Sequence, residues 1–198
     1  QSHELTREWW TKAANEGNEI AAFKLARLYE DGIKVTQSYQ QAVELYTVAA
    51  VQNNTNAMFS LGCMHYHGNG VAQSYETACE WWTKGAEQGH VDAAFQLARL
   101  YEDGKHVTQS YQQAIELYTV AAEQNNTDAM FSLGFMHYHG NGVDKSYAMA
   151  CEWWAKGAEQ GHVDAAFELA RMYEDGIQVA QSYQKAIELY TMAAEKNN

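Results

Sequence analysis

The sequence AAFQLARLYEDG at residues 93–104 decides the fold, because it has the period of an amphipathic helix and recurs along the chain. Within it, Ala94, Leu97 and Tyr101 are spaced so that their side chains share one face of a helix. Gly104 is expected to end this helix, since glycine adopts the left-handed conformation after a helix without steric cost. The stretch therefore predicts the first helix of a repeating element.

The recurrence has two periods. Phenylalanine, leucine, glycine and tyrosine each return at steps of 36 residues, the phenylalanines being Phe23, Phe59, Phe95, Phe131 and Phe167. A higher-order period of 72 residues lies over the first, because residues 19–90 and 91–162 are identical at 58 of 72 positions. Two types of repeat alternate: EDG repeats, whose first helix ends in Glu-Asp-Gly, and HGNG repeats, whose first helix leads into His-Gly-Asn-Gly. A fixed period of about 20 to 50 residues is typical of a solenoid.

A second helix follows in each repeat. Ser110 is a typical N-cap, and Gln113 three positions later completes the pattern of a capping box. We expect this helix to end at Asn125–Asn126 in EDG repeats and at Gly161 in HGNG repeats. Short loops join antiparallel helices, so the sequence predicts an all-α protein, a right-handed α-solenoid superhelix of antiparallel helix pairs.

The predicted organisation is a single array over residues 1–198. Five helix pairs are expected, at residues 18–53, 54–89, 90–125, 126–161 and 162–198, after an orphan second helix at residues 1–17. Both ends then lack the helix that would cover them, so we expect a piece of a longer array. The alternative, that the helix carrying Trp9 and Trp10 is a polar cap, stays open.

The composition excludes several classes of partner. Thirteen Lys and Arg face 25 Asp and Glu, a net charge of −12, which argues against nucleic acids and anionic membrane surfaces. No apolar run approaches the ~20 residues of a membrane span, so no membrane insertion is expected. Three cysteines give no disulfide framework and leave the cellular compartment open.

One set of residues resembles a known family. It comprises Leu61-Gly62, the turn Gly68-Asn69-Gly70-Val71, and then Ala78, Trp81, Gly85-Ala86 and Gly89. This pattern resembles the Sel-one-like repeat (SLR), a relative of the tetratricopeptide repeat. The resemblance implies an adaptor or scaffold that binds a protein or peptide partner and needs no cofactor. The EDG repeats depart from the pattern, since Lys34, His106 and Gln178 replace the second turn glycine, which leaves the loop conformation in question.

The geometry of the tetratricopeptide relative predicts which residues line a concave partner-binding groove. They lie on one face of the first helices: Phe23, Arg27, Asp31, Phe59, Tyr66, His67, Phe95, Arg99, Asp103, Phe135, Tyr138, His139, Arg171 and Asp175. A planar guanidinium suits carboxylates and peptide carbonyls. The alternatives are that each arginine pairs with acidic neighbours on its own helix and that the phenylalanines form core between repeats. In each pair of second-helix tryptophans, one ring is expected in the core.

Other motifs carry less weight. Cys63 and His67 have metal-ligand spacing, but the copied repeat has Phe135 in place of Cys63, so no metal site is predicted. The Ser-x-x-Lys motif at Ser182–Lys185 matches penicillin-recognising serine enzymes only by chance, and an enzyme acting on cell-wall or β-lactam substrates is the weakest hypothesis. Asn53 and Asn125 begin candidate glycosylation sequons, which would permit a secretory route; the localisation is not predicted.

The leading hypothesis is therefore a non-catalytic protein-interaction scaffold that binds a peptide segment or a helix in the concave groove. The alternative is a self-assembling repeat protein, because uncapped ends can stack end to end into longer arrays or filaments.

Overall fold

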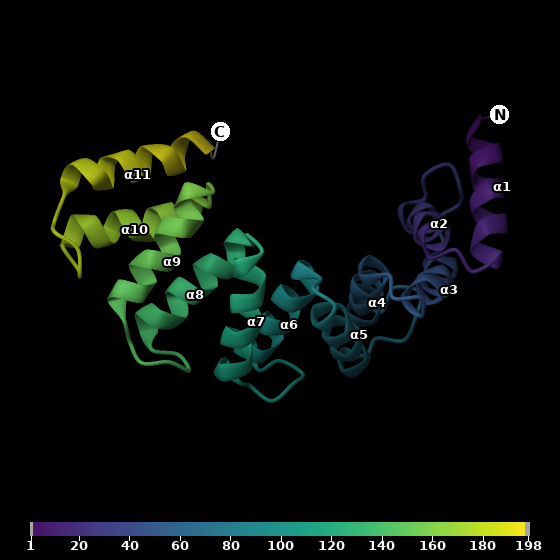
Figure 1. Cartoon of the computed structure of the whole chain (residues 1–198), viewed down its shortest axis with the longest axis horizontal. Helices are drawn as coiled ribbons and strands as arrows, with labels where there is room; N and C mark the ends of the chain where they lie inside the picture. Colours follow the sequence, from purple (N-terminus) through teal and green to yellow (C-terminus); the bar gives the residue numbers. More distant parts are fainter. Residues whose placement is uncertain (1, 197–198) are drawn as a thin grey trace. The chain divides into compact units, whose positions relative to one another are not determined.

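The computed structural model describes the backbone of residues 2–196 and the side chains of residues 7–196. This part of the chain contains eleven α-helices and no strand, which confirms the all-α prediction (Figure 1). The helices are α1 (Ser2–Asn15), α2 (Glu19–Asp31), α3 (Tyr39–Ala50), α4 (Thr55–His67), α5 (Tyr75–Glu87), α6 (Val91–Asp103), α7 (Tyr111–Glu123), α8 (Thr127–His139), α9 (Tyr147–Glu159), α10 (Val163–Asp175) and α11 (Tyr183–Lys196).

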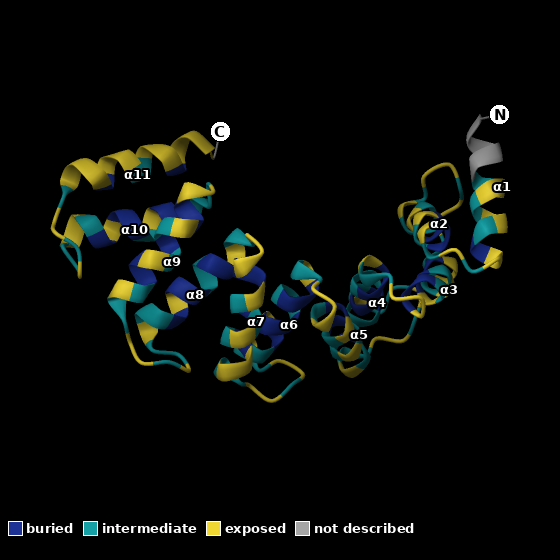
Figure 2. Ribbon diagram, viewed as in Figure 1, coloured by how far each residue is buried: buried dark blue, intermediate teal, exposed yellow. Residues whose placement is uncertain are grey.

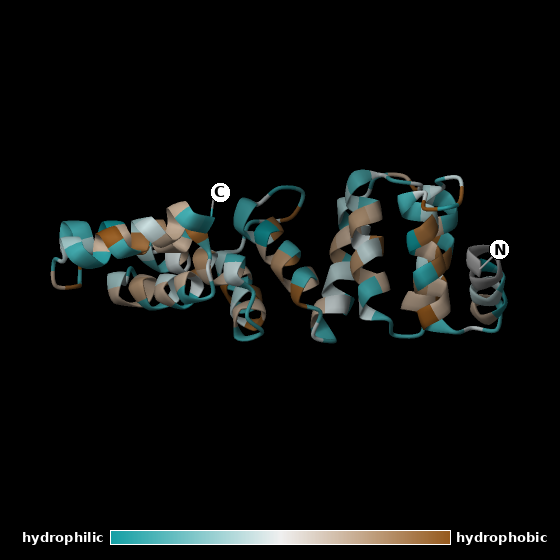
Figure 3. Cartoon of the chain, turned by 90° about the horizontal axis from the view of Figure 1, so that it is seen from above, coloured by the Kyte–Doolittle hydropathy of each residue, from teal (hydrophilic) through white to brown (hydrophobic). Residues whose placement is uncertain are grey.

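The chain divides within α6 into two compact units, unit 1 (Gln1–Leu97) and unit 2 (Ala98–Asn198), each described by itself. Within unit 1, α2 packs against α3 and α4 against α5, and within unit 2, α8 packs against α9 and α10 against α11. Successive pairs are also in contact, as α3 is with α4 and α9 with α10. Buried residues gather where these helices face each other (Figure 2), and hydrophilic residues gather in the loops (Figure 3).

The two helices of a pair run antiparallel. At one end of α4 and α5, the rings of Tyr66 and Tyr75 lie 5.2 Å apart. Further along, Trp82 Nε1 donates to the carbonyl oxygen of Phe59 at 3.2 Å. Residue numbers fall along α4 as they rise along α5, so the short loop reverses the chain as the sequence predicted.

Serine begins the second helices, but not by a complete capping box. The Ser110 hydroxyl accepts from the Gln113 backbone N–H at 3.3 Å, as predicted for an N-cap. The prediction of a complete capping box is wrong: the Ser110 N–H, which the Gln113 side chain was expected to bind, donates to the carbonyl oxygen of Tyr101 at 2.9 Å. The equivalent bond recurs at Ser38, Ser74, Ser146 and Ser182, so each loop is joined back to its own first helix.

The interhelix loops keep one conformation with or without the second glycine. Gly70 and Gly142 have φ of 73° and 72°, in the left-handed region. Lys34, His106 and Gln178 replace this glycine, with φ of 62°, 65° and 58°. The departure from the family pattern therefore leaves the turn unchanged. A residue with a Cβ is less stable than glycine in this left-handed conformation, because the Cβ crowds the backbone.

Large aromatic side chains fill the space between the helices of each pair. Trp82 and Trp154 are 3% and 1% exposed, which confirms that one tryptophan of each pair belongs to the core. Trp82 lies so close to α4 that a Cβ on Gly62 would be 2.2 Å from its Nε1. EDG repeats have alanine at this place, Ala26 in unit 1, and pair it with the smaller ring of Tyr46. The size of the ring and the size of the facing residue therefore change together.

We predict that Gly62→Ala destabilises the fold by about 1 to 3 kcal/mol, the usual range for overpacking a core. Urea unfolding followed by circular dichroism measures this loss. Trp82→Phe also destabilises, but the double variant should lose less than the sum of the single losses, because the smaller ring makes room for the added methyl. Strictly additive losses would contradict the steric pairing of these two positions.

Candidate partner-binding face

The predicted arginines lie on exposed parts of the first helices and pair with acidic neighbours. Arg27 Nη2 lies 3.8 Å from Asp31 Oδ2 on α2, and both side chains are exposed. Arg171 Nη1 lies 3.1 Å from Glu168 Oε2 on α10, and 51% of the arginine side chain remains exposed. Pairing within the helix, the alternative to partner binding, is present in both places. Exposed pairs of this kind contribute only ~0–1 kcal/mol, so a partner can displace them.

The glutamate three residues after each arginine has a different partner. The Tyr118 hydroxyl donates to Glu102 Oε2 at 2.6 Å, and Tyr46 and Tyr190 donate to Glu30 and Glu174 in the same way. Burial first, and then this carboxylate, raise the pKa of Tyr118 above its usual value, so the phenol stays protonated and donates. These bonds, which the sequence did not predict, join the two helices of each EDG repeat.

Tyr66 and Tyr138 occupy the same position in the HGNG repeats and pack toward the second helix. The Tyr138 ring lies 5.0 Å from Tyr147 and 5.5 Å from Trp154 on α9. Tyr66 makes the corresponding contacts with α5, at 5.2 Å from Tyr75 and 5.6 Å from Trp82. Both tyrosines are half-buried, whereas His67 and His139 beside them are exposed.

The phenylalanines of the predicted set divide into two groups. Phe23 and Phe59 are half-buried, 5.6 Å from the Tyr46 ring and 4.9 Å from the His90 ring. Phe135 is 40% exposed, and the ring of His139 lies 4.2 Å from its ring at a tilt of 52°. Phe59 thus packs against the next repeat, whereas Phe23 packs against the second helix of its own repeat, and Phe135 is left as an apolar surface residue. Phe95 is half-buried, and Arg99, Asp103 and Asp175 are exposed.

Two histidines, which the sequence analysis did not assign, join neighbouring repeats. His90 Nδ1 accepts from the Ala93 N–H at 3.1 Å, which caps the start of α6, and its Nε2 lies 3.2 Å from Asn56 Oδ1. Nδ1 is thus the acceptor and Nε2 carries the proton. His162 repeats this arrangement in unit 2, with Asp128 Oδ1 at 3.1 Å from Nε2. Their capping role could have been predicted from their place in the repeat, because the equivalent residues Asn18, Asn54 and Asn126 are helix caps.

The candidate glycosylation residues lie at exposed turns. Asn53 and Asn125 have φ of 64° and 66°, and the Oδ1 of Asn125 accepts from Gln160 Nε2 at 3.3 Å. Asn126, which follows, accepts from the Ala129 N–H at 2.8 Å and begins α8. These turns confirm that the Asn-Asn pair ends one helix, and the structure adds that its second asparagine begins the next. Glycan attachment stays a prediction.

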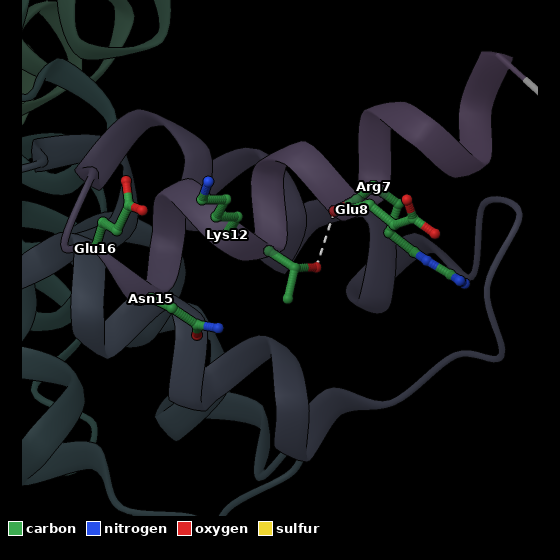
Figure 4. A pocket seen from close by; sticks show the side chains of 6 residues that line it. Arg7, Glu8, Lys12, Asn15 and Glu16 are labelled. Atoms are coloured by element: carbon green, nitrogen blue, oxygen red, sulfur yellow. Dashed lines mark hydrogen bonds between the residues drawn. The ribbon is translucent and has the colours of Figure 1, made fainter.

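Two hollows of the described surface are lined by residues outside the predicted groove set. One of about 530 Å³ runs along α1 and is lined by Arg7, Glu8, Thr11, Lys12, Asn15 and Glu16 (Figure 4). All six side chains are polar or charged, and the Thr11 hydroxyl donates to the Arg7 carbonyl oxygen rather than into the hollow. A second hollow of about 300 Å³ lies among α9, α10 and α11. Neither contains a catalytic constellation.

The other chemical motifs have local roles in the structure. The Ser182 hydroxyl accepts from the Lys185 N–H at 3.3 Å as a helix cap, and Lys185 Nζ lies 4.8 Å from the centre of the Tyr173 ring. Burial raises the pKa of the Cys63 thiol to about 11, so it is not a thiolate at neutral pH. Among residues 7–196, no three His, Cys, Asp or Glu side chains are grouped to hold a metal ion. None of the described helices combines the length and apolar character needed to cross a membrane.

A known protein family shares this repeat architecture. The Sel1 repeat family matches six consecutive segments, residues 1–18, 20–54, 55–90, 91–126, 127–162 and 163–198. The chain belongs to the Sel1 repeat family. This confirms the resemblance seen at Leu61-Gly62 and the Gly-x-Gly turn. Sel1 repeat proteins generally mediate protein–protein interactions and are typically non-catalytic scaffolds.

Solved structures share the fold of this Sel1 repeat protein. The crystal structure of c5321, a protective antigen of uropathogenic Escherichia coli, is 35% identical with a TM-score of 0.93, and the match covers 96% of this chain and 41% of that one. A Sel1 repeat protein from Oxalobacter formigenes is 29% identical with a TM-score of 0.85, over 97% and 85% of the two chains. Helicobacter pylori cysteine rich protein B is 26% identical with a TM-score of 0.51, over 64% and 91%.

These matches show the solenoid fold predicted from the repeat. The chain spans less than half the length of the c5321 protein. No curated protein was found to match the sequence.

We predict that acid weakens the cap made by His90. Desolvation lowers the pKa of His90, so the unfolded chain takes up the proton first. The contribution to the free energy of unfolding is complete above about pH 6.5 and declines as the pH falls below that value. Protonation also places a hydrogen on Nδ1, where the Ala93 N–H must bind. Urea unfolding at about pH 7.5 and about pH 5.5 measures the decline.

The control variant is His90→Asn, which places at this cap the residue found at Asn18, Asn54 and Asn126. It should unfold with a smaller difference between the two pH values, because asparagine caps without titrating. An equal decline in the variant and the parent protein would show that His90 has no part in the acid response.

Proposed function

We propose that this chain is a non-catalytic scaffold that binds a peptide segment of a partner protein along the exposed face of its first helices, in the concave groove expected of the solenoid. One observation carries the proposal. Arg27, Arg99 and Arg171 recur at 72-residue intervals on exposed positions of the first helices. Apart from Arg7, they are the arginines of the chain.

The face offers the two kinds of interaction that peptides need. Exposed guanidinium and carboxylate groups hydrogen-bond to the peptide backbone and its charged side chains. Exposed rings such as Phe135 and His139 bury apolar side chains. The face therefore suits an extended segment or one side of a helix, the two forms in which short peptides are usually recognised.

The test replaces the arginines together. The variant Arg27→Ala, Arg99→Ala, Arg171→Ala should lose at least about tenfold in affinity for peptides that the parent protein selects from a phage-displayed library of random peptides, equivalent to about 1.4 kcal/mol. Fluorescence anisotropy with synthetic copies of the selected peptides measures the affinity, and circular dichroism checks the helices.

A matched control removes three cations elsewhere. Arg7→Ala, Lys12→Ala, Lys105→Ala changes the net charge equally but lies on α1 and in a loop. This variant should bind nearly as well as the parent. Equal affinity for all three proteins, or a library that yields no binding peptide, would remove the proposal.

A second proposal is self-association through α11, and it rests on a different observation. Tyr183 and Ile187 of α11 are 62% and 59% exposed. Their counterparts on α7, Tyr111 and Ile115, are half-buried, and a Cβ on Gly142 of the following loop would lie 2.4 Å from Tyr111 Cβ. On α7 the Gly-x-Gly loop at Gly142 covers Tyr111. The same residue types are exposed on α11, where the Gly-x-Gly loop of a second copy of the chain could cover them in the same way.

Light scattering over a wide concentration range tests this association. We expect the mean mass to rise with concentration and Ile187→Lys to abolish the rise, since a buried ammonium disfavours the contact. Ile115→Val is a control that conserves the packing within unit 2, and Val43 stands at the equivalent position of α3. A constant mass for the parent protein would exclude self-association by this face.

A further inference from the structure

The two 72-residue blocks differ on the surface proposed for partner binding. Residues 19–90 and 91–162 differ at 14 positions, and two of these lie on the equivalent helices α4 and α8. Asn56 on α4 becomes Asp128 on α8, and Cys63 becomes Phe135. Both changes fall on the first-helix face: Asp128 has 64% of its side chain exposed and Phe135 is 40% exposed. The change makes α8 both more acidic and more apolar at its surface than α4.

The neighbouring helix α10 extends this surface within unit 2. The helices α8 and α10 are in contact, and His162 at the start of α10 stacks on Phe131 of α8, with ring centres 5.1 Å apart. Phe167 of α10 is 47% exposed. We define the α8–α10 face by these exposed side chains: Asp128, Phe135, His139, Asp164, Phe167 and Asp175.

The charge of this face is one-sided. Together α8 and α10 contain five carboxylates and one guanidinium, a formal net charge of −4. The guanidinium, Arg171, already lies 3.1 Å from Glu168. The counterparts of α8 and α10 in the preceding 72-residue block are α4 and α6, which contain three carboxylates and one guanidinium, a formal net charge of −2. On α4 and α6, Cys63 and Phe95 are half-buried rather than exposed.

We propose that the α8–α10 face is a docking site for a basic peptide segment that carries large apolar side chains, an inference that rests on the proposed function. The side chains of Phe135 and Phe167 bury the apolar groups of the segment. The exposed carboxylates of Asp128, Asp164 and Asp175 pair with its lysines and arginines, and Arg171 donates to its backbone carbonyl oxygens, as the proposed function assigns to the arginines. Charge complementarity of this kind selects a partner and speeds its encounter, and salt weakens it.

The composition of the selected peptides separates this inference from the proposed function. Phage-displayed random peptides selected on the whole chain should be enriched in lysine or arginine together with phenylalanine, tryptophan or leucine. Selection of acidic or uncharged peptides would overturn the inference and leave the scaffold proposal standing. Selection of no peptide would overturn both.

Matched variants then locate the site. Phe135→Cys and Asp128→Asn place on α8 the residues that α4 has at the same positions, so both fit a folded repeat of this chain. Asparagine also keeps an acceptor for His162, as Asn56 does for His90 at 3.2 Å. The double variant should bind a selected basic peptide at least about tenfold more weakly, measured by fluorescence anisotropy.

The reciprocal variant Cys63→Phe, Asn56→Asp tests whether the same two residues are sufficient. It should add a second, weaker binding site for the same peptide on unit 1, seen as a higher stoichiometry by isothermal titration calorimetry. Binding to the parent protein should weaken as salt rises. Unchanged affinity in the α8 double variant, or an affinity that does not respond to salt, would overturn the assignment of the α8–α10 face.

Discussion

The close approach of the two helices in each pair is the constraint on which the rest of the structure depends. In the HGNG repeats a glycine at position 62 or 134 leaves room for a tryptophan ring, and in the EDG repeats an alanine faces a tyrosine ring. The tyrosine brings a hydroxyl into the interior, and a glutamate of the first helix accepts its hydrogen bond. The tryptophan satisfies its N–H on a backbone carbonyl, so the glutamate position becomes Tyr66 or Tyr138. The alternation of repeats is thus an alternation of two ways to fill one space.

This constraint also decides which side chains remain for binding. Side chains that point toward the second helix pack within the repeat. Between repeats, the ring of Phe59 stacks on His90 and that of Phe131 stacks on His162. Residues on the exposed side of the first helices, such as Arg27, Phe135 and Arg171, do not fill the space between the two helices of a pair. Of these, the position of Phe135 differs between near-identical repeats without loss of the fold, since Cys63 stands there on α4, and the acidic, aromatic surface of α8 and α10 shows this difference.

The sequence predicted the helices and most of their ends, because these depend on spacing within a few residues. The serine caps, the Asn-Asn turns and the buried member of each tryptophan pair are examples. It did not predict the bond between Tyr118 and Glu102, which are sixteen residues apart on different helices, although the two positions change together between repeat types. Nor did it separate Phe135 from Phe59, since a helical period shows the face of a residue but not what covers it. The sequence also left the conformation of the loop at Lys34 undecided. Its surroundings hold this residue in the left-handed region, which a lysine alone disfavours.

The bond between the second-helix serine and the carbonyl nine residues before it has an evolutionary consequence. Ser110 donates to Tyr101, and Ser146 donates to His137, so each interhelix loop is closed by atoms of the same 36-residue segment. A segment inserted by unequal recombination therefore brings its loop closure with it and needs compatible residues only at its two junctions. Arrays of this kind can lengthen or shorten by whole blocks, while the surface within each block diverges separately.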